Sequence, residues 1–113
     1  MARTKTPLLS APPYLVEMAL RRLGSNLRRA RLARNLNLQE VAEKIGTGRR
    51  AVADAERGRP GTAAVVYLAL LWTYDLMGPV SQIADPATDA VGLASAERRK
   101  RARATVPTLD NDF

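Results

Sequence analysis

The chain has 113 residues, a length that allows one domain with tails. It contains no cysteine and no histidine, which excludes disulfides and thiolate chemistry and removes the commonest general base and metal ligand. The formal net charge is +7, and residues 1–60 carry 13 Lys and Arg against 5 Asp and Glu. We therefore expect a non-enzymatic protein with a polyanionic partner and with neither a metal nor a cofactor.

The apolar segments of the chain do not resemble membrane or export signals. The longest apolar run, residues 63–77, contains Asp75 and is too short to span a bilayer. Residues 1–12 are rich in Pro, Thr and Ser, lack the apolar core of a secretory signal, and are expected to form a flexible lead. A cytoplasmic protein is expected. The alternative is a basic amphipathic helix on lipid over residues 20–35, but the caps and turns that follow favour a packed bundle.

The first two helices are predicted from apolar spacing and capping residues. Apolar residues recur every three or four positions from about residue 13 to residue 35. Gly24 inside this helix marks either a break or a close backbone contact. Asn37 and Glu40 form a capping-box pattern that begins a second helix, and Gly46 ends it with a left-handed residue.

Further helices are predicted at residues 49–57 and 62–77, with a short helical turn at 80–84. Together they make an all-α domain over residues 13–84. Residues 85–113 form a C-terminal extension, partly helical or disordered, in which residues 93–104 are a basic helical candidate. For the basic run 98–103 the alternatives are a solvated tail, phosphate contact and docking onto an acidic partner.

Two short helices joined by a glycine-containing turn form a helix-turn-helix, whose second helix can enter the major groove of DNA. Arg49 and Arg50 lie in the first turn of that helix, and the arginine fork matches O6 and N7 of guanine. The alternative is a solvated face. Asp54 would accept from cytosine N4 or brace Arg50. RNA is less favoured, because the basic half lacks the aromatic platforms that stack unpaired bases.

Other side chains are assigned structural roles. Glu56 lies near the buried side of its helix and needs a charged partner, for which Arg31 is the best candidate. Arg28, Arg29 and Arg34 are expected on a solvated face that raises the local positive potential, with direct DNA contact as the alternative. The fourth helix has more large apolar residues than a small domain buries, so some would form a dimer interface or else extend the core. These candidates are Tyr67, Leu71, Trp72, Tyr74 and Met77.

Residues 23–72, LGSNLRRARLARNLNLQEVAEKIGTGRRAVADAERGRP and the apolar helix after it, resemble Xre/Cro-type helix-turn-helix domains of phage repressors and bacterial regulators. The resemblance implies a five-helix, lambda-repressor-like and usually dimeric DNA-binding domain. It supports the pair of Arg31 with Glu56. It also implies base contacts from Arg49, Arg50, Ala53 and Asp54, and backbone contacts from Asn37, Thr47, Gly48, Arg57 and Arg59.

One residue departs from the family pattern. The family often has Gln at the first position of the second helix, where this chain has Leu38. Gln39 is the candidate that would replace this phosphate contact in part.

Residues 85–103, DPATDAVGLASAERRKRAR, are similar to the segment that follows the helix-turn-helix in HipB-like antitoxins. That resemblance implies a HipA-like Ser/Thr kinase toxin as partner and repression of the shared operon. The predicted function is a double-stranded DNA-binding repressor that binds a palindromic operator as a homodimer. The alternatives are a stand-alone Xre-type or phage repressor, and an antitoxin that acts chiefly by protein–protein inhibition.

Overall fold

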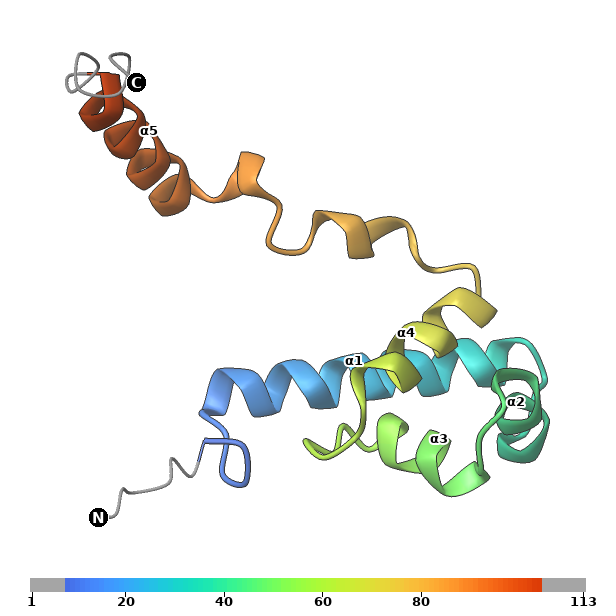
Figure 1. Cartoon of the computed structure of the whole chain (residues 1–113). Helices are drawn as coiled ribbons and strands as arrows, with labels where there is room; N and C mark the ends of the chain where they lie inside the picture. The colour runs from blue at the N-terminus through green and yellow to red at the C-terminus, as the bar shows by residue number, and fades with distance from the viewer. Residues whose placement is uncertain (1–7, 105–113) are drawn as a thin grey trace. The chain divides into compact units, whose positions relative to one another are not determined.

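The computed structural model describes residues 8–104, which contain five α-helices, two 3-10 helices and no strand. The expected all-α, five-helix architecture is confirmed. The chain divides into two compact units, the first ending at Met77 and the second beginning at Gly78. The first unit holds α1 (Tyr14–Ala33), α2 (Leu38–Ile45), α3 (Arg49–Glu56) and α4 (Ala64–Thr73) (Figure 1).

Helix α1 continues through Gly24 without a break. A Cβ atom on Gly24 would lie 2.5 Å from the carbonyl oxygen of Ala55 and 2.6 Å from that of Glu56. Gly58, which has a φ of +70°, approaches the backbone of Leu20 and Arg21 just as closely. The two glycines therefore let α1 pack backbone to backbone against the end of α3, and Gly24 marks a close contact.

The turn between α2 and α3 forms as the sequence predicts. The Asn37 side chain accepts from the Glu40 amide at 2.8 Å, and the Glu40 carboxylate accepts from the Asn37 amide at 2.8 Å. Gly46 ends α2 in the left-handed region with a φ of +79°. Gly48 then begins α3 in an extended conformation, so the chain reverses within a few residues.

The core of the first unit is built from all four of its helices and the residue after α4. Its buried apolar members are Leu27, Val41, Ala42, Val52, Ala55, Tyr67, Leu70 and Tyr74. Tyr67 and Tyr74 were candidates for a dimer interface, but they are 6% and 1% exposed and are core residues instead. The reason is their spacing with Leu70, which places all three on the inward face of α4 and its C-cap.

Helix α4 is shorter than the residues 62–77 expected for it. It ends at Thr73, Tyr74 is its C-cap, and Asp75 has a φ of +59°. Arg34 completes this end, because its guanidinium donates to the Tyr74 carbonyl at 2.9 Å and lies 5.3 Å from the ring centre. Arg34 is exposed, as expected, and it also makes a structural contact that we did not expect.

The second unit contains η1 (Gly78–Gln82), η2 (Pro86–Thr88) and α5 (Ala90–Ala104). Asp85 caps η2 by accepting from the Ala87 amide at 2.9 Å. Asp89 accepts from the Gly92 amide at 3.0 Å at the start of α5. The basic run 98–103 is helical. Residues 1–7 of the expected lead and residues 105–113 of the extension lie outside the described residues.

Candidate nucleic-acid interface

Helix α3 is held in place by buried residues and by one ion pair. Val52 and Ala55 are fully buried. Arg31 Nε lies 2.7 Å from Glu56 Oε2, and Arg31 Nη2 lies 3.0 Å from Glu56 Oε1, so the expected pair is present and bidentate. The side chains of Arg31 and Glu56 are 9% and 6% exposed. A bidentate pair of this kind restricts the direction in which α3 points from α1.

Arg31 also connects α3 to the loop before α2. Its Nη1 atom donates to the carbonyl oxygen of Leu36 at 2.9 Å. The hydrogen bond to Glu56 raises the pKa of Arg31, against the lowering effect of burial. The guanidinium is therefore charged throughout the physiological range and pairs with the buried carboxylate.

The outer face of α3 brings most of the predicted base-reading residues together. Arg49 and Arg50 are exposed in its first turn. A surface hollow of about 430 Å³ is lined by Leu38, Arg49, Arg50, Ala53 and Arg57. Three of the four residues assigned to base contact thus share one hollow with Arg57, one of the residues assigned to phosphate.

Asp54, the fourth of these residues, lies in a different environment. Its Oδ1 atom is 3.4 Å from Arg59 Nε and 3.6 Å from Arg57 Nη1. It lines a separate hollow with Arg59 and the residues of the loop before α4. Arg57 and Arg59, rather than Arg50, are its ion-pair partners, and the carboxylate braces the loop that follows α3.

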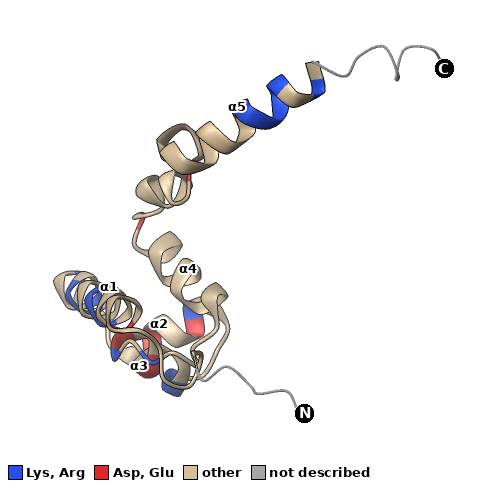
Figure 2. Cartoon of the chain, turned by 90° about the vertical axis from the view of Figure 1, so that its left-hand side faces the viewer, with Lys and Arg blue, Asp and Glu red and all other residues tan. Residues whose placement is uncertain are grey.

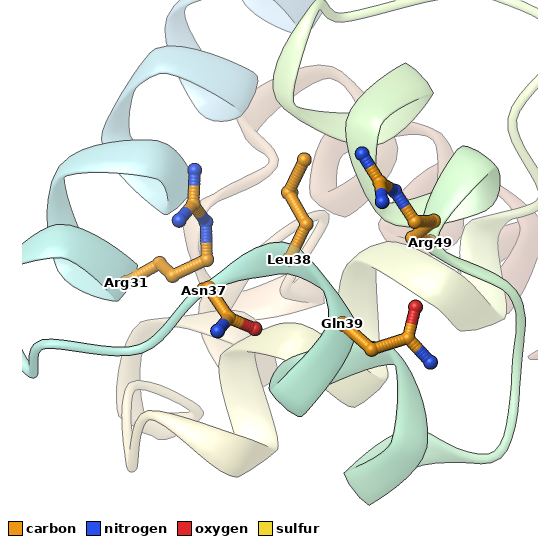
Figure 3. Close-up of a pocket in the computed structure, with 5 residues that line it drawn as sticks. All are labelled: Arg31, Asn37, Leu38, Gln39 and Arg49. Carbon is orange, nitrogen blue, oxygen red and sulfur yellow. The ribbon is translucent and has the colours of Figure 1, made fainter.

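The start of α2 faces α3 across a second hollow of about 430 Å³, lined by Arg31, Asn37, Leu38, Gln39 and Arg49. Figure 3 shows Leu38 projecting between the side chains of Arg31 and Arg49. The Asn37 oxygen is used in the helix cap, and Gln39 Nε2 donates to Glu43 Oε2 at 3.0 Å. A phosphate contact by Gln39 would therefore replace an existing exposed hydrogen bond.

Thr47 and Gly48 complete the set of predicted backbone contacts. They form the turn directly before Arg49, and Thr47 donates its amide to the carbonyl of Ala42 at 2.9 Å. A Cβ atom on Gly48 would meet nothing within 4 Å, so the backbone here is open to a ligand. The turn places its polar groups beside the first turn of α3.

Arg28 is exposed, in agreement with the solvated face expected for it, and it also lies beside this surface. A hollow of about 250 Å³ is lined by Arg28 and Arg31 of α1, Leu38 of α2, and Ala53, Glu56 and Arg57 of α3 and its C-cap. Arg28 lies one helical turn before Arg31 on the same side of α1. That spacing from the predicted ion pair is the signal in the sequence that could have identified it.

Four arginines therefore surround an apolar centre. Leu38 lines three of the four hollows, and Arg28, Arg49, Arg50 and Arg57 line one or more of these three with it. The Glu56 carboxylate near them is neutralised by Arg31. Guanidinium groups around a shallow concave surface can bind a polyanion that presents both phosphates and planar base edges.

A helix-turn-helix family model matches residues 27–68, which begin in α1 and end in α4. No curated protein and no solved structure matches the chain. Within residues 8–104, no helix has the length and apolar character needed to cross a membrane, and no group of His, Cys, Asp and Glu could hold a metal ion. The matched family indicates a DNA-binding transcription regulator. The match and the arrangement of the helices identify residues 27–68 as a helix-turn-helix domain with the all-α, lambda-repressor-like fold.

Proposed function

We propose that the protein is a sequence-specific repressor that binds double-stranded DNA in the cytoplasm and has no enzymatic activity. One observation carries the proposal: α3 exposes Arg49 and Arg50 in its first turn while the buried pair of Arg31 with Glu56 fixes the helix. Base recognition needs long hydrogen-bond donor side chains on a helix of fixed orientation, because a bidentate contact to guanine tolerates little misalignment.

The contacts with DNA divide by position on the domain. Arg49, Arg50 and Ala53 face the bases, and Asp54 either accepts from a cytosine or holds the arginines beside it. Residues around this face contact phosphates and set the register of the helix on the duplex. They are Asn37, Gln39, Thr47, Gly48, Arg57 and Arg59. The ion pairs of Asp54 with Arg57 and Arg59 support this division, because they hold both cations at the end of α3.

Selection from a random duplex library tests the proposal. Arg49→Ala and Arg50→Ala should each relax the preference at a G·C pair by about 1–3 kcal/mol, roughly 5- to 150-fold in discrimination. Arg59→Ala should weaken all sequences alike and reduce the salt dependence of binding. Arg29→Ala, which removes an exposed charge of α1 from a separate hollow, is the control. Wild-type base preferences in both α3 variants would contradict the proposal.

We further propose that the repressor binds a palindromic operator as a homodimer, with half-sites about one helical turn apart. Support comes from an exposed apolar stripe along α4, formed by Val65, Leu68 and Trp72, which are 69%, 40% and 72% exposed. Leu71 and Met77, both earlier candidates, are partly exposed near it.

The dimer is tested by sedimentation and by fluorescence, because Trp72 is the single tryptophan of the chain. Its emission should shift to shorter wavelength as the protein is concentrated, and Val65→Glu should abolish the shift. Exposed Leu9, on the N-terminal side of α1, supplies the control variant Leu9→Glu. A monomer at all concentrations, with or without operator DNA, would contradict this part of the proposal.

A second candidate function is that of an antitoxin for a HipA-like Ser/Thr kinase, which would repress the shared operon. It is favoured by the resemblance of residues 85–103 and by the exposure of Val91 and Leu93 on α5, 78% and 48%. The capping contacts of Asp85 and Asp89 account for these two residues without a partner.

Co-purification with the product of the adjacent gene tests the antitoxin function. The double variant Val91→Ser, Leu93→Ser should bind this product more weakly. If the double variant Arg49→Ala, Arg50→Ala still inhibits the kinase, the antitoxin effect arises from protein contact alone. A neighbouring gene that encodes no kinase would leave a stand-alone Xre-type or phage repressor.

A further inference from the structure

The C-terminal half of α5 carries a dense group of cations outside the helix-turn-helix domain. Figure 2 shows Lys and Arg gathered in this half of the helix. The group consists of Arg98, Arg99, Lys100, Arg101 and Arg103, all of them exposed. At a rise of about 1.5 Å per residue, these side chains occupy roughly 9 Å of helix axis.

Local contacts support the formation of α5. Asp89 accepts from the Gly92 amide at 3.0 Å at the start of the helix. Arg101 and Arg103 lie in its last turn, where the helix dipole favours cations. None of its described side chains is buried. Packing therefore does not require the cationic group.

The cationic group also has few internal partners. The ion pairs within residues 8–104 all lie in the first unit, and Arg98 donates to Ser95 Oγ at 3.2 Å. Like charges one to four residues apart repel one another, which lowers the stability of an isolated helix. A polyanion bound along this half of α5 would relieve that repulsion.

We propose that the cationic half of α5 binds the phosphate backbone of DNA beside the operator, without reading its sequence. The inference rests on the proposed function, since the helix-turn-helix domain brings the chain to DNA. Duplex DNA carries one negative charge per about 1.7 Å of axis, and five cations over roughly 9 Å match that density. Each residue turns the helix by about 100°, so the cations point to all sides and form no single reading face.

The distribution of residues along α5 favours DNA over a lipid surface. Helices that lie on membranes segregate apolar and basic residues onto opposite faces along their whole length. In α5 the large apolar residues, Val91 and Leu93, lie in the first half and the cations in the second. The helix also belongs to the chain that holds the operator, so its effective concentration at flanking phosphates is high without strong contacts of its own.

The test compares two charge-matched variants of the full chain. The α5 variant carries Arg99→Gln, Lys100→Gln and Arg101→Gln, because Gln retains good helix propensity. The control carries Arg21→Gln, Arg22→Gln and Arg29→Gln, three arginines that line a hollow on α1 containing no residue of α2 or α3. Binding is measured by fluorescence anisotropy from about 50 to 300 mM salt, where counterion release is read as a slope.

Three duplexes are used: the selected operator with flanks, the operator trimmed to its contacted base pairs, and a random sequence. On the flanked and random duplexes the α5 variant should lower the slope of log K against log salt by about 1–2, or about one or two phosphate contacts at 0.9 each. Its affinity at 0.1 M salt should fall roughly 10- to 100-fold. Its base preferences should not change, and on the trimmed duplex it should bind like wild type.

Three results would overturn the proposal. The first is a wild-type slope for the α5 variant. The second is an equal decrease in the α1 control, which would make the effect one of net charge. The third is that wild type binds vesicles containing phosphatidylserine and the α5 variant does not, while the salt dependence of DNA binding is the same in both. Failure of the proposed function would appear differently, as an absence of base preference in wild type, and the slope on random DNA would still test α5.

Discussion

Helices α3 and α5 both expose arginines, but among the described residues only α3 has side chains buried in a core. Val52 and Ala55 of α3 are fully buried, and Glu56 pairs with Arg31 of α1. Helix α5 has no buried side chain among its described residues. The proposed DNA contacts of the two helices differ accordingly. A guanidinium on a helix held by buried contacts can be aligned with a base edge, whereas phosphate neutralisation does not require such alignment.

The anchoring of α3 has three separate physical sources. Burial of Val52 and Ala55 supplies the apolar contribution, and the pair of Arg31 with Glu56 supplies direction. Gly24 supplies the close approach of α1 to the carbonyl groups at the end of α3. Helix α5 has the Asp89 cap and the favourable position of its last-turn cations, and none of its described side chains is buried. Variants that remove the ion pair, the close approach at Gly24 and the Asp89 cap test whether this contrast holds.

The largest effect is expected from Glu56→Ala. The change leaves the Arg31 guanidinium buried without its partner, so the free energy of unfolding should fall by about 3–5 kcal/mol. Glu97→Ala, which removes an exposed carboxylate of α5, should change it by no more than about 0.5 kcal/mol. Urea unfolding followed by circular dichroism measures both. A loss below about 1 kcal/mol for Glu56→Ala would show that the ion pair does not anchor α3.

Gly24→Ala should have the next largest effect. Its Cβ would lie 2.5 Å from the Ala55 carbonyl oxygen, so the backbones of α1 and α3 must separate. We expect a net loss of about 1–3 kcal/mol, although Ala is the better helix former. Ser25→Ala, an exposed change in the same helix, is the control. If Gly24→Ala stabilised the protein, the close approach of α1 to α3 would not constrain the fold.

Asp89→Ala should have a smaller and local effect. It removes the side-chain acceptor at the start of α5, which is worth about 1 kcal/mol of helix stability. Helicity measured by circular dichroism should decrease, while the urea midpoint of the first unit should stay at its wild-type value. A decrease in both the helicity and the urea midpoint of the first unit would indicate that α5 stabilises the first unit.

The smallest effect concerns alkaline pH. Burial raises the pKa of Tyr74 above its ordinary value near 10, and burial also raises that of Tyr67. The folded state therefore favours the neutral phenols. Their contribution to stability is complete below about pH 10 and is lost as the pH rises through the raised pKa.

Urea unfolding at about pH 8 and pH 11 measures this loss. Tyr74→Phe should reduce it and should differ from wild type by no more than about 1 kcal/mol at pH 8. Tyr14→Phe, a change at a residue 71% exposed, should leave the alkaline loss unaltered. If the free energy of unfolding decreased equally at alkaline pH in the Tyr74 and Tyr14 variants, the buried phenol of Tyr74 would not cause the decrease.

Much of the candidate site could be predicted because its signals are local or chemically unambiguous. The caps and the turn around Gly46 depend on residues within a few positions of one another, and so do the bounds of α2 and α3. The pair of Arg31 with Glu56 is long-range, but a carboxylate on the buried side of a helix requires a cation. The end of α4 was predicted too far along the chain, because apolar composition does not show where a helix stops.

The amino-acid sequence by itself determined the helices, the turn that joins α2 to α3, and the cationic first turn of α3, because capping and apolar spacing act over a few residues. Tertiary structure decided which side of each helix is used. It directed Tyr67 and Tyr74 into the core, paired Asp54 with Arg57 and Arg59, and placed Arg28 in one hollow with Ala53 and Arg57. It also made Gly24 a point of contact. These outcomes depend on the angle at which one helix packs against another, and no local pattern specifies that angle.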